Sequence, residues 1–202
     1  MIPSDFLTKE QFQTLLKAAR TKKERAILLL LGGCGLRVSE VTALRVEDID
    51  PENGFIYVRH GKGNKDRTVT APKNTLIAID DFKRSFLPYD PFQNGKDYLF
   101  SGRQNGHLSS WEVSYILDQI AEIAHMQEHR PPEPGKIRHR KKITPHLLRH
   151  SHASWMLDLN MPISDVQDQL GHASIATTGI YLKKRPNHRR ESFLRHGGDS
   201  IV

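Results

Sequence analysis

Three short segments of the sequence gather residue types that act on phosphate groups. Gly35–Leu44 holds an arginine, Arg37, at a turn-to-helix junction, and Thr144–Ser151 holds a histidine and an arginine three residues apart. The third segment, Leu170–His172, is followed nine residues later by a tyrosine. Arginine presents a planar fork that suits phosphate oxygens, and a tyrosine beside such groups can act as a nucleophile. If the three segments converge in space, they form a site for a phosphate.

Local structure already places several of these side chains. Arg37 precedes a predicted helix, where main-chain N–H groups favour an anion, and Glu40 lies three residues further on, within reach to orient it. His146 and Arg149 are also three residues apart and share one face of a predicted helix. Lys62 lies at the tip of a predicted hairpin, a position from which loops commonly present functional groups.

The residue pattern predicts a mostly α-helical chain with a small antiparallel β-sheet, which is an α+β fold in one domain. Residues 55–60 and 67–71 alternate apolar and polar side chains around a glycine-rich turn, as in a β-hairpin. Thr8 and Gln11 form a predicted capping box at the start of the first helix. Further helices are predicted at 22–31, 38–44, 72–86, 109–126, 144–160, 162–170 and 174–182, and a short strand at 97–100.

Composition excludes several classes of protein. The 202 residues contain 30 Lys+Arg against 23 Asp+Glu, a net charge of +7, and such a basic surface makes nucleic acid the default partner. The single cysteine, Cys34, permits no internal disulfide, and we expect it to be a small core residue. The longest apolar run is shorter than the ~18 residues of a membrane span, and the N-terminus shows no secretory pattern. We therefore expect a cytoplasmic protein.

Taken in order, the motifs resemble those of the tyrosine recombinase (phage integrase) family. Gly-Leu-Arg-x-Ser-Glu from residue 35 resembles the first arginine box, and Gly-Lys-Gly-Asn-Lys-x-Arg from residue 61 resembles the β-hairpin lysine motif. His-x-x-Arg-His from residue 146 and Leu-Gly-His…Tyr from residue 170 resemble the second box. The resemblance covers the chain from about Phe6 to Tyr181. Each motif is short, but their shared order and spacing make chance a poor explanation.

The resemblance implies site-specific recombination of DNA by strand cleavage and rejoining. Tyr181 would attack a scissile phosphate, giving a 3′-phosphotyrosine and a free 5′-hydroxyl. Arg37 and Arg149 would hold the non-bridging oxygens and stabilise the pentavalent transition state, and Lys62 would protonate the leaving 5′-oxygen. The reaction would need no ATP, metal or other cofactor, because the phosphotyrosine conserves the phosphodiester energy and the arginines supply the positive charge.

The resemblance assigns the remaining polar residues to supporting roles. His146 would assist proton transfer at the tyrosine hydroxyl, His172 would donate a hydrogen bond to the phosphate, and Glu40 would hold the site together from outside. Lys65 competes with Lys62 for the general-acid role, and the family pattern favours Lys62. The candidate DNA contacts are Lys65, Arg67, Lys136, Arg138, Arg140, Lys141, Lys142 and His150.

Domain organisation follows from where the family pattern lies in the chain. Many family members carry a separate helical N-terminal domain, and here the catalytic pattern starts within the first ten residues. We expect that domain to be absent, residues 1–182 to form the catalytic domain, and the basic tail 183–202 to dock on a neighbouring copy or contact DNA. The expected partners are duplex DNA and other copies of the chain, assembled as a tetramer on paired sites and as a monomer or weak oligomer without DNA. Neither a membrane nor a small-molecule cofactor is expected.

Several other interpretations stay open at this point. The same tyrosine chemistry could relax DNA, as a type IB topoisomerase does, or the chain could be a catalytically silent DNA-binding regulator. His146 and His150 have the i,i+4 spacing of a zinc pair, although no third ligand is evident, and a metal-dependent nuclease would need a carboxylate cluster. The other tyrosines are expected to be packing residues: Tyr57, Tyr89, Tyr98 and Tyr115.

Overall fold

The computed structural model describes residues 6–59, 66–86, 97–102, 106–126 and 142–171. The elements in chain order are α1 Lys9–Ala18, α2 Lys22–Leu28, the π-helical turn η1 Leu29–Gly33, α3 Val38–Ala43, the 3₁₀ turn η2 Val46–Asp48, β1 Ile49–Asp50, β2 Phe55–Val58, β3 Arg67–Thr70, α4 Lys73–Arg84, α5 Ser110–Ile123, α6 Pro145–Asp158 and α7 Ile163–Leu170. This is the predicted mostly α-helical chain with a small antiparallel sheet.

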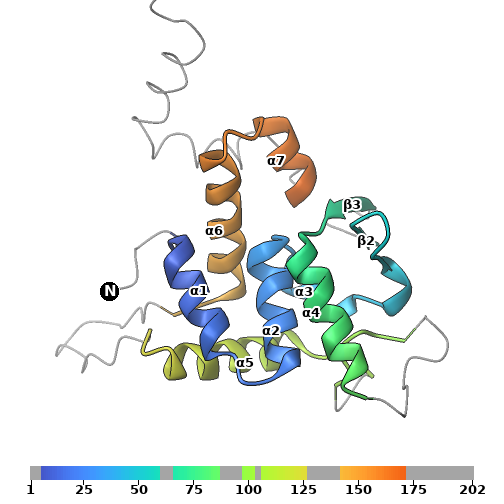
Figure 1. The fold of residues 1–202 in the computed structure, drawn as a ribbon, viewed down its shortest axis with the longest axis vertical. Helices are drawn as coiled ribbons and strands as arrows, with labels where there is room; N and C mark the ends of the chain where they lie inside the picture. Colours follow the sequence, from blue (N-terminus) through green and yellow to red (C-terminus); the bar gives the residue numbers. More distant parts are fainter. Residues whose placement is uncertain (1–5, 60–65, 87–96, 103–105, 127–141, 172–202) are drawn as a thin grey trace, which may run out of the picture.

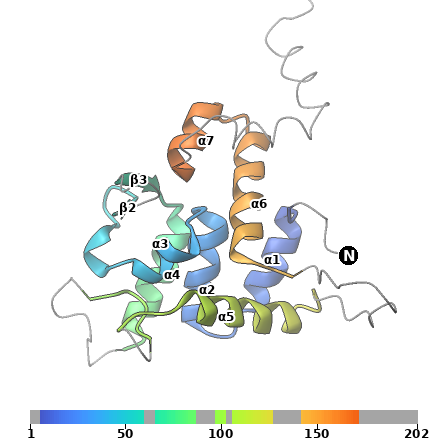
Figure 2. The ribbon, with the colours of Figure 1, turned by 180° about the vertical axis from the view of Figure 1, so that it is seen from behind.

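The helices surround one buried pair of elements, α2 and η1. Residues 26–31 form a continuous apolar run, and all of their side chains lie in the core. Helix α5 crosses the base of α1 and α2, α6 stands beside α1, and α7 turns back from the far end of α6 toward the sheet (Figures 1 and 2). None of the helices in the described ranges has the length and apolar character that a bilayer span requires.

Side-chain caps fix where several helices begin. Thr8 and Gln11 form the predicted capping box at the start of α1, with each side chain bonded to the other residue's main-chain N–H. Thr144 caps α6, which carries Pro145 in its first turn, where the missing N–H of proline costs nothing. The cap prediction for α1 is therefore confirmed.

The predicted helix 22–31 changes character before it ends. From Leu29 the turns widen to π-helical geometry, so that the N–H of Cys34 donates to the carbonyl of Leu29 at 3.0 Å. Gly32 lies within this turn against the ring of Phe12, where a Cβ would approach ring carbon Cε2 to 2.5 Å. The widened turn leads directly into the loop before α3, and it leaves carbonyls that side chains of α6 and α7 reach.

The sheet is antiparallel with strand order β1-β2-β3. Its hairpin β2–β3 was predicted, and Ile56 pairs with Val69 in the observed register. The two-residue strand β1 was not predicted. The predicted strand at 97–100 is wrong, because this segment makes only an isolated bridge, between Tyr98 and Arg45. Leu99 and the residue after it are fully buried, so the apolar pattern there reflects core packing. The predicted helix 174–182 lies outside the described residues.

Gly35 and Gly106 provide a matched test of packing around the loop before α3. Both have left-handed backbones, with φ of +70° and +71°, but only at Gly35 would a Cβ collide with neighbours, at 2.6 Å from His152 Cδ2 and 2.9 Å from Leu170 Cδ2. We expect Gly106→Ala to lower the free energy of unfolding by about 1 kcal/mol, the backbone cost alone. Gly35→Ala should lower it by about 3 kcal/mol, because overpacking is added. Urea unfolding of both variants measures the difference, and equal losses would contradict the predicted collision.

Candidate active site

The carboxylate of Glu40, on α3, binds three arginines from different parts of the chain. Its Oε1 accepts from Arg37 Nη1 and from Arg67 Nη1, both at 2.7 Å. Its Oε2 accepts from Arg67 Nη2 at 2.8 Å and from the main-chain N–H of Arg37 at 2.7 Å. Arg149 Nη1 lies 3.8 Å from the same oxygen. Residues separated by more than a hundred positions therefore meet around one buried anion.

The surroundings of Glu40 hold it in the charged form. Burial by itself would raise the pKa of this carboxyl, but hydrogen bonds from Arg67 and from the main chain of Arg37, together with the charge of Arg67, outweigh that cost. They lower its pKa from the ordinary 4.5 to about 2. Glu40 is thus a permanent negative charge at neutral pH.

The same arginines hold the C-terminal end of α7. Arg67 Nε donates to the carbonyl of Gln169 at 3.3 Å, Arg149 Nη2 to that of Leu170, and Arg37 Nη2 to that of Gly171 at 2.8 Å. These are three consecutive carbonyls at the negative end of the helix, where cations are favoured. A Cβ on the left-handed Gly171 would lie 2.7 Å from Arg67 Cδ, so the close approach of that side chain requires glycine.

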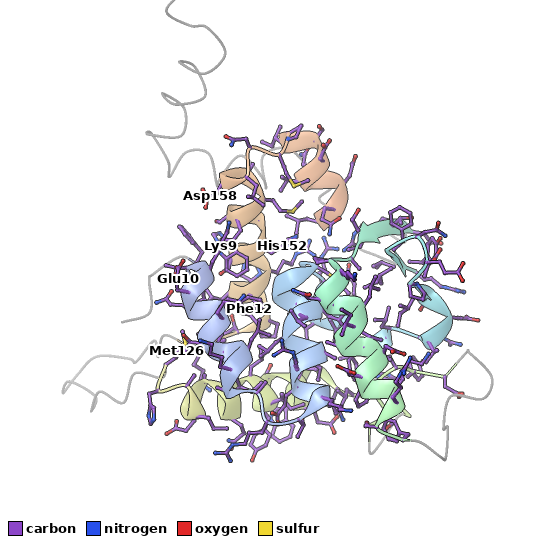
Figure 3. The ribbon with its side chains drawn as sticks, in the orientation of Figure 1. Lys9, Glu10, Phe12, Met126, His152 and Asp158 are labelled. Carbon is purple, nitrogen blue, oxygen red and sulfur yellow. The ribbon has the colours of Figure 1, made fainter. Side chains whose placement is uncertain are left out.

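Side chains of α6 hold the π-helical turn and the loop after it. Arg149 Nη1 donates to the carbonyl of Gly35 at 2.5 Å, and His152 Nδ1 bonds the carbonyl of Gly32 at 3.1 Å. Figure 3 shows His152 between α6 and the helix that ends in this turn. Burial lowers the pKa of His152 to about 4, against the partial support of its bond to Gly32, so the ring is neutral and donates from Nδ1.

The cluster carries an excess of positive charge. Three guanidinium groups face one carboxylate, and the side chain of Arg37 is the most exposed of the three at 23%, against 12% for Arg67 and 8% for Arg149. Each guanidinium has five N–H donors, and Arg37 uses one on Glu40 and one on Gly171. A partly exposed, pre-oriented and net-positive cluster is suited to bind a phosphate.

Two of the histidines predicted to act near this cluster, His146 and His150, lie on α6. His146 is exposed in the first turn of α6, one turn before Arg149. His150, one turn after His146, is half-buried. Their ring centroids are 6.3 Å apart. Across the described ranges, no group of three or more His, Cys, Asp or Glu side chains could hold a metal ion.

Two of the residues that were predicted to contact DNA have partners within the protein. Arg67 is directed inward to Glu40 and Gln169, and Lys142 binds Asp118 of α5 at 2.9 Å while its side chain stays 43% exposed. The sequence contained a signal for the inward direction of Arg67, because strand alternation places this residue on the same face as the buried Val69. The other basic residues and the remaining catalytic candidates lie outside the described residues: Lys62, Lys65, Lys136, Arg138, Arg140, Lys141, His172 and Tyr181, together with the tail 183–202.

Two buried residues of α6 and α7 that bond the main chain around the cluster, His152 and Gln169, were absent from the predicted site. The apolar stripe of α7 provided a signal for the second, because Gln169 lies three residues after the buried Val166 and so shares its face. His152 likewise lies four residues after the buried Leu148 on α6, but its partner, a main-chain carbonyl on another helix, leaves no signal in the sequence.

The expectations for cysteine and tyrosine have mixed outcomes. Cys34 is fully buried, as predicted, and burial raises the pKa of its thiol to about 12. Tyr98 packs against the ring of His107, with centroids 4.8 Å apart. Tyr115 is 52% exposed but stacks on the ring of Trp111, with centroids 5.6 Å apart, and the packing prediction is wrong for Tyr57, which is 42% exposed. Tyr89 lies outside the described residues.

Comparison with known proteins places this fold and cluster. The Phage integrase family model matches residues 5–188. Tyrosine recombinase XerA of Pyrococcus furiosus is 39% identical over 94% of this chain and 60% of its own length, and Tyrosine recombinase XerC of Oceanobacillus iheyensis is 31% identical over 86% of this chain and 53% of its own. A crystal structure of XerA recombinase superposes with a TM-score of 0.76 at 30% identity, over 98% of this chain and 66% of that one.

A more distant structure shares the fold alone. The Tn1549 transposon integrase in complex with transposon right end DNA has a TM-score of 0.69 at 21% identity, over 96% of this chain and 67% of that one. The architecture is thus the catalytic-domain fold of tyrosine recombinases. The chain belongs to the phage integrase family. It spans between 53% and 60% of the length of the two curated relatives described above.

Replacing Glu40 with glutamine tests the central anion. We expect Glu40→Gln to lower the free energy of unfolding at pH 7 by about 3 kcal/mol, because the buried arginines lose their compensating charge. The wild-type carboxylate contributes fully above its unfolded pKa near 4.5, and this contribution is lost as pH falls toward 2, so the gap between the two proteins should narrow over that range. Glu47→Gln, at the exposed pair with Arg59, is the control and should cost less than about 1 kcal/mol. A constant gap would contradict the prediction.

Replacing His152 tests the neutral buried ring. Between its folded pKa of about 4 and the ordinary 6.5, the unfolded chain binds a proton that the folded chain does not, so the wild type loses stability as pH falls through this range. The loss due to this residue is about 3 kcal/mol. We expect His152→Asn to be less stable at pH 7.5 but to lose less on acidification, measured by urea unfolding at both pH values. His125→Asn, at an exposed position, is the control, and a wild-type slope in His152→Asn would contradict the prediction.

Proposed function

We propose that this chain is an enzyme that cleaves and rejoins DNA strands at specific sites, as a tyrosine recombinase. The observation that carries the proposal is the net-positive cluster of Arg37, Arg67 and Arg149 around Glu40. Membership of the phage integrase family, and the named XerA and XerC relatives, supply the class of substrate. Charge supports it as well, because a net +7 favours a polyanionic partner.

The proposed reaction exchanges one phosphoester for another. The oxygen of Tyr181 bonds to the scissile phosphorus while the bond to the 5′-oxygen breaks, giving a 3′-phosphotyrosine. His146 takes up the phenolic proton, and Lys62 supplies a proton to the leaving 5′-oxygen. Arg37 and Arg149 hold the non-bridging oxygens, whose charge grows in the pentavalent transition state, and His172 adds a hydrogen bond. Religation runs the same steps in reverse, so no ATP, metal or other cofactor enters the balance.

Glu40 gives Arg37 a fixed geometry in this scheme. Its two oxygens orient Arg37 through both the side chain and the main chain. Because the donors are already ordered, the protein does not have to reorganise when charge develops on the phosphate. The proposed partners are duplex DNA and further copies of this chain, which join as a tetramer on two sites.

A covalent trap tests the proposal. A pool of labelled nicked duplexes with randomised arms is incubated with the protein in EDTA, and SDS-resistant protein–DNA adducts are isolated and their DNA sequenced. We expect the wild type to form adducts enriched in a common sequence and Tyr181→Phe to form none, because only the phenol oxygen can bond to the phosphate. Tyr57→Phe, at an exposed tyrosine of β2, is the control and should behave as the wild type.

Each other outcome has a definite meaning. Adducts from Tyr181→Phe would assign the nucleophile to another residue. If the wild type and both variants bind DNA but none forms an adduct, the silent DNA-binding regulator is favoured. Cleavage that occurs without EDTA but not with it would favour a metal-dependent nuclease. If adducts form, the products on supercoiled circles carrying two copies of the enriched sequence distinguish recombinant junctions from simple relaxation.

A further inference from the structure

Residue 169 contacts strand β3 at both of its ends. Its main-chain carbonyl accepts from Arg67 Nε, at the first residue of the strand, at 3.3 Å. Its side-chain amide bonds Thr70, the last residue, twice: Oε1 accepts from the Thr70 N–H at 3.0 Å, and Nε2 donates to the Thr70 carbonyl at 3.0 Å. The amide thus pairs with both main-chain groups of Thr70, as a neighbouring strand would.

This pairing lies at the edge of the sheet. β3 is the last strand in the order β1-β2-β3, and β1 has only two residues. A hairpin of this size has little stability by itself and takes its orientation from what packs against it. Helix α7 packs against β3, and Gln169 is buried at the contact.

The same side chain also reaches the loop that carries Arg37. Gln169 Nε2 lies 3.3 Å from the carbonyl of Cys34, one residue before the Gly35 carbonyl that Arg149 binds. A single amide therefore connects the hairpin, the end of α7 and the approach to α3. Because an amide offers both donors and an acceptor, neither glutamate nor a methionine of similar size could make all three bonds.

We propose that Gln169 is a positioning residue that sets the hairpin β2–β3 against the arginine cluster. Lys62 lies in the sequence between these two strands, so a tilt of the hairpin moves the attachment points of the segment that contains it. The inference rests on the proposed function, in which Lys62 protonates the leaving oxygen. It predicts that loss of the Gln169 amide impairs this proton transfer and leaves the arginine clamp in place. Arg37 and Arg67 keep their bonds to Glu40, and all three arginines keep their bonds to the carbonyls at the end of α7.

The test uses a substrate that needs no general acid. The nicked duplex enriched in the adduct screen is made with sulfur in place of the 5′-bridging oxygen, and a thiolate leaves without being protonated because a thiol is far more acidic than an alcohol. We expect Gln169→Met to form adducts about 10–100-fold more slowly than the wild type on the oxygen substrate, with unchanged DNA affinity. On the sulfur substrate it should regain the wild-type rate, as Lys62→Ala should.

Two further variants separate positioning from general damage. Gln169→Glu keeps the acceptor for the Thr70 N–H but places a carboxylate oxygen against the carbonyls of Thr70 and Cys34, so it should be no faster than Gln169→Met on the oxygen substrate. Gln167→Met makes the same chemical change two residues earlier on α7, at a more exposed position, and should match the wild type on both substrates. Slow adduct formation by Gln169→Met on both substrates, with Lys62→Ala restored by sulfur, would overturn the inference and leave the proposed function standing.

A second readout does not depend on activity. This readout is amide hydrogen exchange at Thr70. It decides the inference about Gln169 even if the sulfur substrate does not restore Lys62→Ala, a result that would overturn the proposed role of that lysine. Faster exchange of the Thr70 N–H in Gln169→Met, with exchange in α2 unchanged, supports a hairpin held by this amide. Unchanged exchange at Thr70 would overturn it.

Discussion

Three guanidinium groups lie close together in this protein around one carboxylate that compensates part of their charge. Glu40 is buried, and it bonds Arg37 and Arg67 directly while Arg149 stays within 3.8 Å. Taking charges out of water is costly, and here the cost is offset because both oxygens of the carboxylate are saturated with donors. The pKa of about 2 expresses the same balance. Without Glu40 the arginines would repel one another, and the segments that carry them would lose their common anchor.

The end of α7 completes this electrostatic arrangement. Its last carbonyls carry partial negative charge and would be unsatisfied in an isolated helix, and three arginines bind them in succession. One set of donors thus caps a helix and also forms the proposed phosphate clamp. The segment that follows α7 in the sequence contains His172 and Tyr181, the proposed nucleophile. The cap therefore fixes the position of Gly171, the residue after which this segment begins.

Main-chain carbonyls determine the rest of the geometry. The π-helical turn after α2 and the loop that follows it present the carbonyls of Gly32, Cys34 and Gly35 to His152, Gln169 and Arg149, respectively. Such turns are uncommon and are often found at functional sites. In this chain the turn joins α6 and α7 to the loop before Arg37, which explains why a glycine with a left-handed backbone and no room for a Cβ is needed at position 35.

The fold class, the hairpin strands, the cap of α1 and the proximity of Arg37 to Glu40 could be predicted from the sequence, because they depend on contacts between residues near one another in the chain. The sequence also carried the family motifs, from which the proposed chemistry follows. The remaining features depend on the tertiary structure: the change to π geometry after α2, the bonds of Arg67 to Glu40, the isolated bridge at Tyr98 and the amide contacts of Gln169. All but the first involve a main-chain group or a charge more than twenty residues away. In the π turn, packing determines the local helical geometry. Periodicity indicates which face of a helix or strand is buried, but it does not indicate which residue the buried side chain contacts.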